Sequence, residues 1–551
     1  MTEFRFPPLK LKQCCGTCGG DQVATSSRLP PGVDTFHHNN HPGIVKRSSV
    51  SGICDYTDPG HSGPFKCVFE KGYSIPWSKD TKEALPARLY MPGTSWNGLC
   101  LTATGPFPLV VILHAFGVPG FKAETYHLAY AVLAQHLASH GFIVAVLNRR
   151  TDKPNYPVAD NGDIIEEHVH HLFTKEVSAQ RLQNSVALIG HSSGGEMVIK
   201  NAHRISKPLD PSHVSKNLNA VALMATTVPT MSVAETVAFG NVTGAFMGLM
   251  NSSDGDTGAY GPKDDNMPMR SVLGIYDVVG VNPLSPISSA EKDMVYMKVY
   301  DTVLWDDYTH FFQDKVFARA YIAAFLNRHL YGNTSYVKVL KYGEIPASVK
   351  ATLPSPDKLR LHREHSDRIG KLVVADFESF PNLIQSTYGI SFSVGPSYIL
   401  DDFSAHNTNV LRISWDKTTA PGKFSKNILT INFIKPYDLS KYSHLSLRIC
   451  QAYPGIEQDL DVGIQLSEGA MVLLSAYGPK LRQPPHFAVG NKSAIKNVME
   501  TYLIPLGAFG VGTTLSKVTH VNLDFSVNPA SKATFFVDSI EFLQDESGSC
   551  A

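Results

Sequence analysis

The chain has 551 residues, of which 43% are hydrophobic and 18% charged, the composition of a globular protein. A chain of this length is expected to form two or more domains, because single cores rarely grow beyond ~250–300 residues. Lys plus Arg and Asp plus Glu both number 49, a balance that argues against a nucleic-acid-binding protein. The sequence contains no apolar run near the ~20 residues that span a bilayer, so no transmembrane segment is expected.

Residues 1–75 are predicted to form an irregular arm, because they are rich in Pro, Gly, Ser and His without sustained hydrophobic periodicity. The arm has no apolar segment of the signal-peptide type, which predicts a cytoplasmic protein unless the N-terminus is incomplete. Four N-glycosylation sequons would suit a secreted protein, but sequons arise by chance at about this density, so the compartment stays open. The sequons lie at Asn241, Asn251, Asn333 and Asn491.

Eight cysteines are too few for a fold built on disulfides. A first group in the arm could bind zinc with nearby histidines, although a glycine-rich leader explains the same residues. This group comprises Cys14, Cys15 and Cys18, and the histidines are His37, His38 and His41. Cys54, Cys67 and Cys100 could pair in an oxidising compartment, with a connectivity that the sequence does not give.

Residues 76–335 alternate predicted strands and helices, the pattern of a doubly wound, mostly parallel α/β domain. Most predicted strands are short continuous apolar runs, as expected where both faces of a sheet are covered. The predicted strands are 87–91, 109–113, 142–147, 186–189, 220–224, 272–276 and 294–300. The predicted helices are 123–139, 164–182, 195–204 and 315–330, and 227–269 is predicted to be an insertion that forms a lid.

The motif Gly190-His-Ser-Ser-Gly194 directly follows a predicted strand and directly precedes a predicted helix. This is the context of a nucleophile elbow, in which a sharp turn exposes the serine hydroxyl above a sheet. The helix N-terminus behind it favours developing negative charge. Ser192 is therefore the predicted nucleophile.

A serine nucleophile needs a histidine base and an acid that orients it, in the chain order Ser, Asp, His for this fold. His310 is the predicted base, because it lies between the last predicted strand and the closing helix. Asp277 is the predicted acid, because it follows the predicted penultimate strand, 272–276. The competing carboxylates are Asp301, Asp306 and Asp307.

The predicted oxyanion hole consists of two backbone N–H groups. One belongs to Ser193, the residue after the nucleophile. The other is assigned to Phe116, in the segment that follows the strand 109–113. Phe116 could equally be an apolar residue that lines the site.

The segments LVVILHAFG, LAQHLASHGFIVAVLN, VALIGHSSGG and YTHFF, in this order, resemble the α/β-hydrolase superfamily over residues 85–332. LASHGFIVAV and GHSSGG are most similar to the chlorophyllase and cutinase-like polyester hydrolase group. The resemblance implies hydrolysis of a carboxylic ester by an acyl-enzyme mechanism, with no cofactor or catalytic metal. Its implied partner is a small or polymeric hydrophobic ester.

Residues 336–369 are predicted to be a linker. Residues 370–546 are predicted to form a β-sandwich, because apolar and polar residues alternate along their predicted strands. VVADFE at 373–378 and TFFVDSIEF at 534–542 resemble the ends of galactose-binding-like jelly rolls, including carbohydrate-binding modules. The resemblance implies a structural calcium held by Glu378 and Asp538. Exposed aromatic residues could stack on a glycan, although aromatic residues of a sandwich more often belong to its core. The candidates are Trp415, Tyr453 and Tyr477.

Two alternatives to the esterase hypothesis stay open. The same triad could hydrolyse an amide or a thioester, or the hydrolase fold could be a platform for a glycan-binding sandwich. A further histidine-rich run, Glu166–His171, is predicted to lie on a solvated helix face, with a metal site as its alternative.

Overall fold

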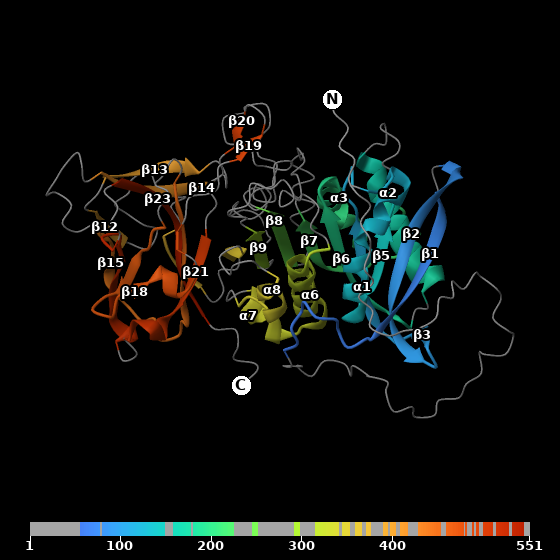
Figure 1. The fold of residues 1–551 in the computed structure, drawn as a ribbon, viewed down its shortest axis with the longest axis horizontal. Helices are drawn as coiled ribbons and strands as arrows, with labels where there is room; N and C mark the ends of the chain where they lie inside the picture. Colours follow the sequence, from blue (N-terminus) through green and yellow to red (C-terminus); the bar gives the residue numbers. More distant parts are fainter. Residues whose placement is uncertain are drawn as a thin grey trace. The chain divides into compact units, whose positions relative to one another are not determined.

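The computed structural model describes the chain from residue 56 to residue 544, with gaps, and everything below concerns these residues (Figure 1). They are 56–77, 80–118, 120–148, 158–177, 180–224, 245–251, 291–297, 314–340, 344–352, 359–365, 371–375, 390–394, 397–403, 408–416, 428–452, 459–478, 480–481, 487–489, 492–494, 500–510, 514–527 and 532–544.

A ten-stranded sheet organises the first part of the chain, with the order β1-β2-β5-β4-β6-β7-β8-β9-β10 and β3 paired to β2. Neighbours from β5 to β9 run parallel, whereas β1, β2, β3 and β10 pair antiparallel to their neighbours. The bounds are β1 Cys67–Trp77, β2 Asp80–Trp96, β3 Leu99–Thr102, β4 Phe107–Leu113, β5 Ile143–Leu147, β6 Leu182–His191, β7 Asn217–Met224, β8 Ala245–Asn251, β9 Glu291–Met297 and β10 Leu359–His365.

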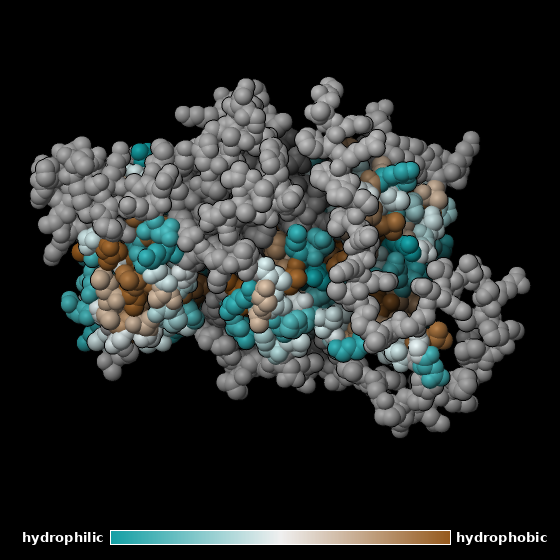
Figure 2. Space-filling view, viewed as in Figure 1, coloured by the Kyte–Doolittle hydropathy of each residue, from teal (hydrophilic) through white to brown (hydrophobic). Residues whose placement is uncertain are grey.

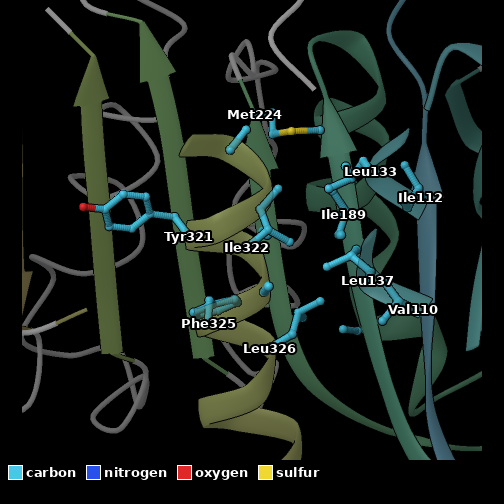
Figure 3. Packing of buried hydrophobic residues seen from close by; sticks show 14 of the residues in the cluster. Val110, Ile112, Leu133, Leu137, Ile189, Met224, Tyr321, Ile322, Phe325 and Leu326 are labelled. Atoms are coloured by element: carbon cyan, nitrogen blue, oxygen red, sulfur yellow. The ribbon is translucent and has the colours of Figure 1, made fainter. Parts of the chain in front are cut away.

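Helices cover both faces of this sheet, which makes it doubly wound as predicted. α1 (Ala131–Ser139) and α6 (Val316–Tyr331) pack with Val110 and Ile112 of β4, and Figure 3 shows part of this cluster. α2 (Val158–His171) and α3 (Ser193–Asn201) pack on the opposite face. All of β4 is therefore buried, which explains why its sequence is a continuous apolar run.

Two predicted helices differ from the structure at their ends. The predicted helix 123–139 begins as a 3₁₀-helix over Ala123–Tyr130 and becomes α1 at Ala131. The predicted helix 164–182 is α2, which begins at Val158, followed by one π turn over Leu172–Glu176. The predicted end at residue 182 coincides with the start of β6 at Leu182, because the polar sequence of this stretch does not mark where the helix stops.

β8 lies inside the segment that was predicted to be an insertion. Its sequence, AFMGLMN, contains a glycine and no β-branched residue, so its intrinsic preference for a strand is weak. Pairing with β7 on one side and β9 on the other gives the segment its strand conformation. The predicted strand 272–276 lies outside the described residues.

Regular elements occupy part of the segment 336–369 that was predicted to be a linker. They are α7 (Val337–Leu340), α8 (Ala347–Lys350) and β10, which pairs with β9. Of the candidate cysteines, Cys67 and Cys100 form a disulfide with a Cα–Cα distance of 5.9 Å that joins β1 to β3. Cys54 lies outside the described residues.

Two antiparallel sheets follow in the C-terminal part, and their facing residues form one hydrophobic cluster. One sheet has the order β13-β14-β23-β16-β21 with β11 paired to β23, and the other has the order β12-β15-β22-β17-β18. The bounds are β11 Lys371–Ala375, β12 Ile390–Val394, β13 Ser397–Phe403, β14 Thr408–Asp416, β15 Ile428–Tyr437, β16 His444–Gln451, β17 Gly463–Leu466, β18 Val472–Leu473, β21 Glu500–Pro505, β22 Val518–Asp524 and β23 Lys532–Leu543. A jelly-roll topology stays a prediction.

Hydrophilic and hydrophobic residues are interspersed on the face of the described surface that Figure 2 shows. Among the helices of the described ranges, none has the length and hydropathy that crossing a membrane requires.

Candidate active site

Ser192 lies at the junction of β6 and α3 with a backbone conformation that few non-glycine residues adopt. Its φ is 52° and its ψ is −127°. The Ser192 N–H donates to the Met224 carbonyl at 2.9 Å, and the Gly195 N–H donates to the Ser192 carbonyl at 2.8 Å. These bonds hold the turn between strand and helix, which is the backbone geometry of a nucleophile elbow. Ser192 is only 8% exposed, however, so the residue is buried and not exposed as the sequence predicts.

Two glycines make this turn sterically feasible. A Cβ atom on Gly190 would lie 2.4 Å from the Cα of Gly195, in the first turn of α3. A Cβ atom on Gly194 would lie 2.4 Å from the Leu113 carbonyl oxygen, at the end of β4. The sequence pattern G-x-S-x-G is therefore explained by close backbone contacts on both sides of Ser192.

The predicted oxyanion donors belong to segments that meet at this edge of the sheet. Ser193 is the first residue of α3 and directly follows Ser192. Phe116 belongs to the segment His114–Val118, which follows β4 and is called the oxyanion loop because the second oxyanion donor is predicted there. Leu113 of β4 pairs with Gly190 of β6, so the loop and the elbow leave adjacent parallel strands together. Ser192, Ser193 and Phe116 thus lie on neighbouring segments.

Phe116 is 62% exposed, and its ring packs edge-on against Tyr126, with 6.4 Å between the ring centroids. Phe121, further along the same connection, is also exposed. Exposed aromatic side chains such as these, on the connection that follows β4, offer apolar surface that suits a hydrophobic ligand.

His310 and Asp277 lie outside the described residues, and so do the competing acids Asp301, Asp306 and Asp307. The strand order of the sheet nevertheless indicates which segment should carry the carboxylate that is predicted to orient His310. The strand between β7 and β9 is β8, whereas Asp277 was chosen because 272–276 was expected to be the penultimate strand. The first carboxylates after β8 are Asp254 and Asp256. Neither is predicted from the sequence, because the sequence pattern does not reveal β8.

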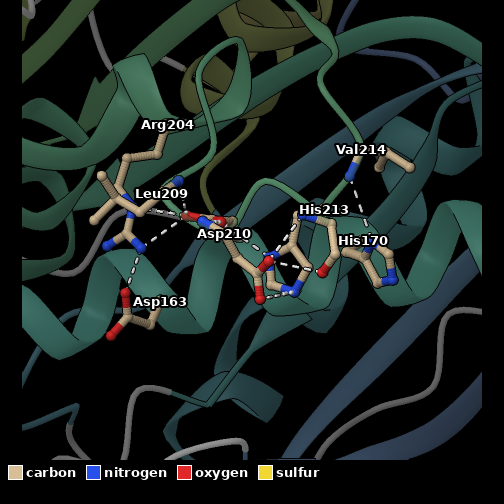
Figure 4. Close-up of polar contacts among 9 residues, drawn as sticks. Asp163, His170, Arg204, Leu209, Asp210, His213 and Val214 are labelled. Carbon is tan, nitrogen blue, oxygen red and sulfur yellow. Dashed lines mark hydrogen bonds and ion pairs between the residues drawn. The ribbon is translucent and has the colours of Figure 1, made fainter.

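α2 carries a buried polar network rather than the solvated face predicted for Glu166–His171 (Figure 4). Glu166 is 4% exposed and accepts hydrogen bonds from Arg204 Nε at 2.9 Å and from the Leu209 and Asp210 N–H groups. Its Oε1 also lies 2.9 Å from His213 Nδ1. The network ties α2 to the segment between α3 and β7, on the face of the sheet that carries α3.

The pKa of Glu166 is the balance of opposing effects. Burial raises the pKa, but the hydrogen bonds from Asp210, Leu209 and Arg204 outweigh burial and lower the pKa below the ordinary value. The carboxylate therefore stabilises the folded state above the ordinary pKa of Glu. This contribution is lost as the pH falls through the lowered value.

Glu166→Gln should lower the free energy of unfolding by about 3 kcal/mol near neutral pH, since it removes one charge from a buried ion pair. The matched control is Glu196→Gln on α3, whose partner Lys200 lies on the same partly exposed helix surface. That change should cost less than ~0.5 kcal/mol. Urea unfolding of both variants measures the difference, and equal losses would contradict the structural role of Glu166.

The histidines of α2 also have structural partners. His168 is fully buried, its Nδ1 lies 3.0 Å from Tyr73 Oη, and burial lowers its pKa to about 3. The His170 ring packs on the His213 ring at 4.5 Å, and the Val214 N–H donates to His170 Nδ1. Within the described ranges, no group of three or more His, Cys, Asp or Glu side chains is arranged to hold a metal.

In the C-terminal part, Asp538 is 1% exposed and lies 2.9 Å from the Arg448 guanidinium. Arg448 gives this carboxylate a positive partner, and Glu378 lies outside the described residues, so the calcium site stays a prediction. Tyr477 packs against the hydrophobic cluster of the two sheets. Tyr453 and the side chain of Trp415 are not described, and glycan binding likewise stays a prediction.

No protein-family model matches the chain, and no curated protein matches it in sequence. Solved structures match parts of it. Esterase B from Lactobacillus rhamnosis is 18% identical, with a TM-score of 0.26 over 34% of this chain and 67% of that one. XC6422 from Xanthomonas campestris, an α/β serine hydrolase without a lid, is 13% identical. Its TM-score is 0.29, and the match covers 49% of this chain and 94% of that one.

A family 11 carbohydrate-binding module from Clostridium thermocellum, solved with a mixed-linked tetrasaccharide, also matches. It is 14% identical, with a TM-score of 0.21 over 32% of this chain and 98% of the module. At these TM-scores the similarities carry no argument about the function of this chain.

Proposed function

We propose that the chain is a serine hydrolase of carboxylic esters that acts through an acyl-enzyme intermediate on Ser192. The observation that carries this proposal is the backbone of Ser192, at a positive φ between β6 and α3 and flanked by glycines in close backbone contact. Strained residues of this kind are found where a fold presents a functional group. The position at the carboxyl end of a parallel strand is where open α/β sheets bind ligands.

In the proposed reaction, the Ser192 hydroxyl attacks the ester carbonyl while His310 accepts its proton. The N–H groups of Ser193 and Phe116 stabilise the negative charge that develops on the carbonyl oxygen. His310 then protonates the leaving alcohol, and water releases the acyl group by the same steps in reverse. No cofactor or metal takes part in these steps.

The acid that orients His310 is proposed to lie in the connection between β8 and β9. Catalytic groups of an open parallel sheet follow the carboxyl ends of its strands, which favours Asp254 or Asp256, shortly after β8. Asp277 lies further along the same connection and is kept as the alternative.

The substrate is proposed to be a hydrophobic ester, with chlorophyllase-like and polyester-like substrates as the implied classes. The exposed rings of Phe116 and Phe121, on the connection that follows β4, support this choice, because exposed apolar surface favours binding of a hydrophobic ligand. Hydrolysis of an amide or a thioester would use the same catalytic residues, so only an activity assay distinguishes these substrates from esters.

The full-length chain should hydrolyse p-nitrophenyl esters, with kcat/KM rising from acetate to longer acyl chains. The assay series runs from acetate to palmitate beside an aromatic polyester, and includes a matched amide and a matched thioester. Activity should survive EDTA, since no metal takes part. Hydrolysis of the amide or the thioester in preference to the esters would replace the ester assignment, and the absence of any hydrolysis would refute the proposal.

A further inference from the structure

A chain of buried hydrogen bonds joins the oxyanion loop to the nucleophile elbow. The Ala115 N–H donates to Tyr130 Oη at 2.9 Å, and Tyr130 Oη lies 2.7 Å from His191 Nδ1. Ala115, Tyr130 and His191 are all fully buried, and the two rings meet edge to face with 5.8 Å between their centroids. Hydrogen bonds shielded from water in this way have little competition and restrict the groups that they join.

The two ends of this chain are the immediate neighbours of the reacting groups. Ala115 directly precedes Phe116, the proposed oxyanion donor, and His191 directly precedes Ser192, the proposed nucleophile. Tyr130, at the end of the 3₁₀-helix that leads into α1, lies between them. Its hydroxyl therefore fixes the oxyanion loop relative to the elbow through one atom.

A second bond fixes the orientation of the donor itself. His114 Nδ1 lies 2.7 Å from the Ala115 carbonyl oxygen, and because a carbonyl accepts, the ring nitrogen donates. In a planar trans peptide the C=O and the following N–H point in opposite directions. Holding the Ala115 carbonyl therefore also sets the direction of the Phe116 N–H.

We propose that Tyr130 and His191 are positioning residues, which hold the Phe116 N–H at the distance from Ser192 that the oxyanion requires. This inference rests on the proposed function. Neither side chain needs to touch the substrate for this role. A phenylalanine at position 130 would fill the same core volume, so the hydroxyl adds the link and not the packing.

The test is Tyr130→Phe in the full-length chain, assayed on p-nitrophenyl butyrate. Loss of one oxyanion donor costs about 10²–10³ in kcat, and a displaced donor should lose part of this. We expect kcat to fall by about 10- to 100-fold while KM changes by less than about 3-fold, because the interaction is made in the transition state. The rate of labelling by a fluorophosphonate should fall by a similar factor.

The matched control is Tyr331→Phe, which removes a hydroxyl that donates to the Gly141 carbonyl, away from the oxyanion loop. It should change the melting temperature as Tyr130→Phe does but leave kcat at the wild-type value. His191→Leu and the double variant Tyr130→Phe/His191→Leu, together with Tyr130→Phe and the wild type, form a double-mutant cycle. If both residues act through one link, the double variant loses little more than the worse single variant.

The outcomes separate this inference from the proposed function. A wild-type chain that neither hydrolyses esters nor reacts with the fluorophosphonate would refute both. An active wild type with an unchanged kcat in Tyr130→Phe would refute the positioning role alone. Equal losses of kcat in Tyr130→Phe and Tyr331→Phe would also refute it, because they would indicate a general effect of removing a tyrosine hydroxyl.

Discussion

Ser192→Ala should abolish ester hydrolysis by the full-length chain while leaving its fold intact. Removal of the nucleophile from a serine protease triad costs roughly 10⁶-fold in kcat, and the same order of loss is expected here. The change deletes one small hydroxyl and keeps a Cβ atom at the same backbone position, so the free energy of unfolding should change little. Initial rates on p-nitrophenyl butyrate and a thermal melt measure the two effects.

Ser193→Ala is the matched control, because it deletes the hydroxyl of the next residue and keeps the backbone N–H that is the proposed oxyanion donor. Its rate should stay within about 10-fold of wild type, since the N–H and not the hydroxyl is assigned a role. A Ser192→Ala variant that retains near wild-type turnover, or a Ser193→Ala variant that loses as much, would contradict the assignment of the nucleophile.

The second large effect is expected at the acid that orients His310. Conversion of that Asp to Asn keeps its shape but removes the charge that stabilises the imidazolium, and can lower kcat by up to ~10⁴-fold. Asp254→Asn, Asp256→Asn and Asp277→Asn should therefore be compared side by side. We expect the large loss at Asp254 or Asp256, because β8 lies between β7 and β9 in the sheet and catalytic groups of an open parallel sheet follow the carboxyl ends of its strands.

The three variants serve as controls for one another, since each makes the same chemical change in the same connection. A large loss at Asp277 would restore the original prediction from the sequence. A large loss at Asp306 or Asp307, with all three others active, would move the acid to the segment of the histidine itself and refute both placements.

The parts of the site that the sequence predicts well are those whose residues are contiguous. β6, the glycine-flanked serine and α3 follow one another directly, so local steric rules are sufficient to identify Ser192. β4 and β5 were predicted for a similar reason, because strands covered on both faces have apolar side chains throughout.

The features of the fold and the site that the sequence does not predict depend on contacts between residues distant in the sequence. β8 is a strand because β7 and β9 flank it, which its methionine- and glycine-containing sequence does not reveal. The polar residues of α2 suggested a solvated face, but Glu166 is buried because Arg204 and two backbone N–H groups satisfy its carboxylate. The bond between Tyr130 and His191 likewise has no local signature.

The most direct test of Ser192 as the nucleophile is to locate the covalent adduct of a fluorophosphonate on the full-length chain. The labelled protein is digested, and the modified peptide is sequenced by mass spectrometry. We predict one adduct, on Ser192, formed at a rate that an excess of p-nitrophenyl butyrate lowers. An adduct on another residue, or no reaction by a chain that hydrolyses esters, would contradict it.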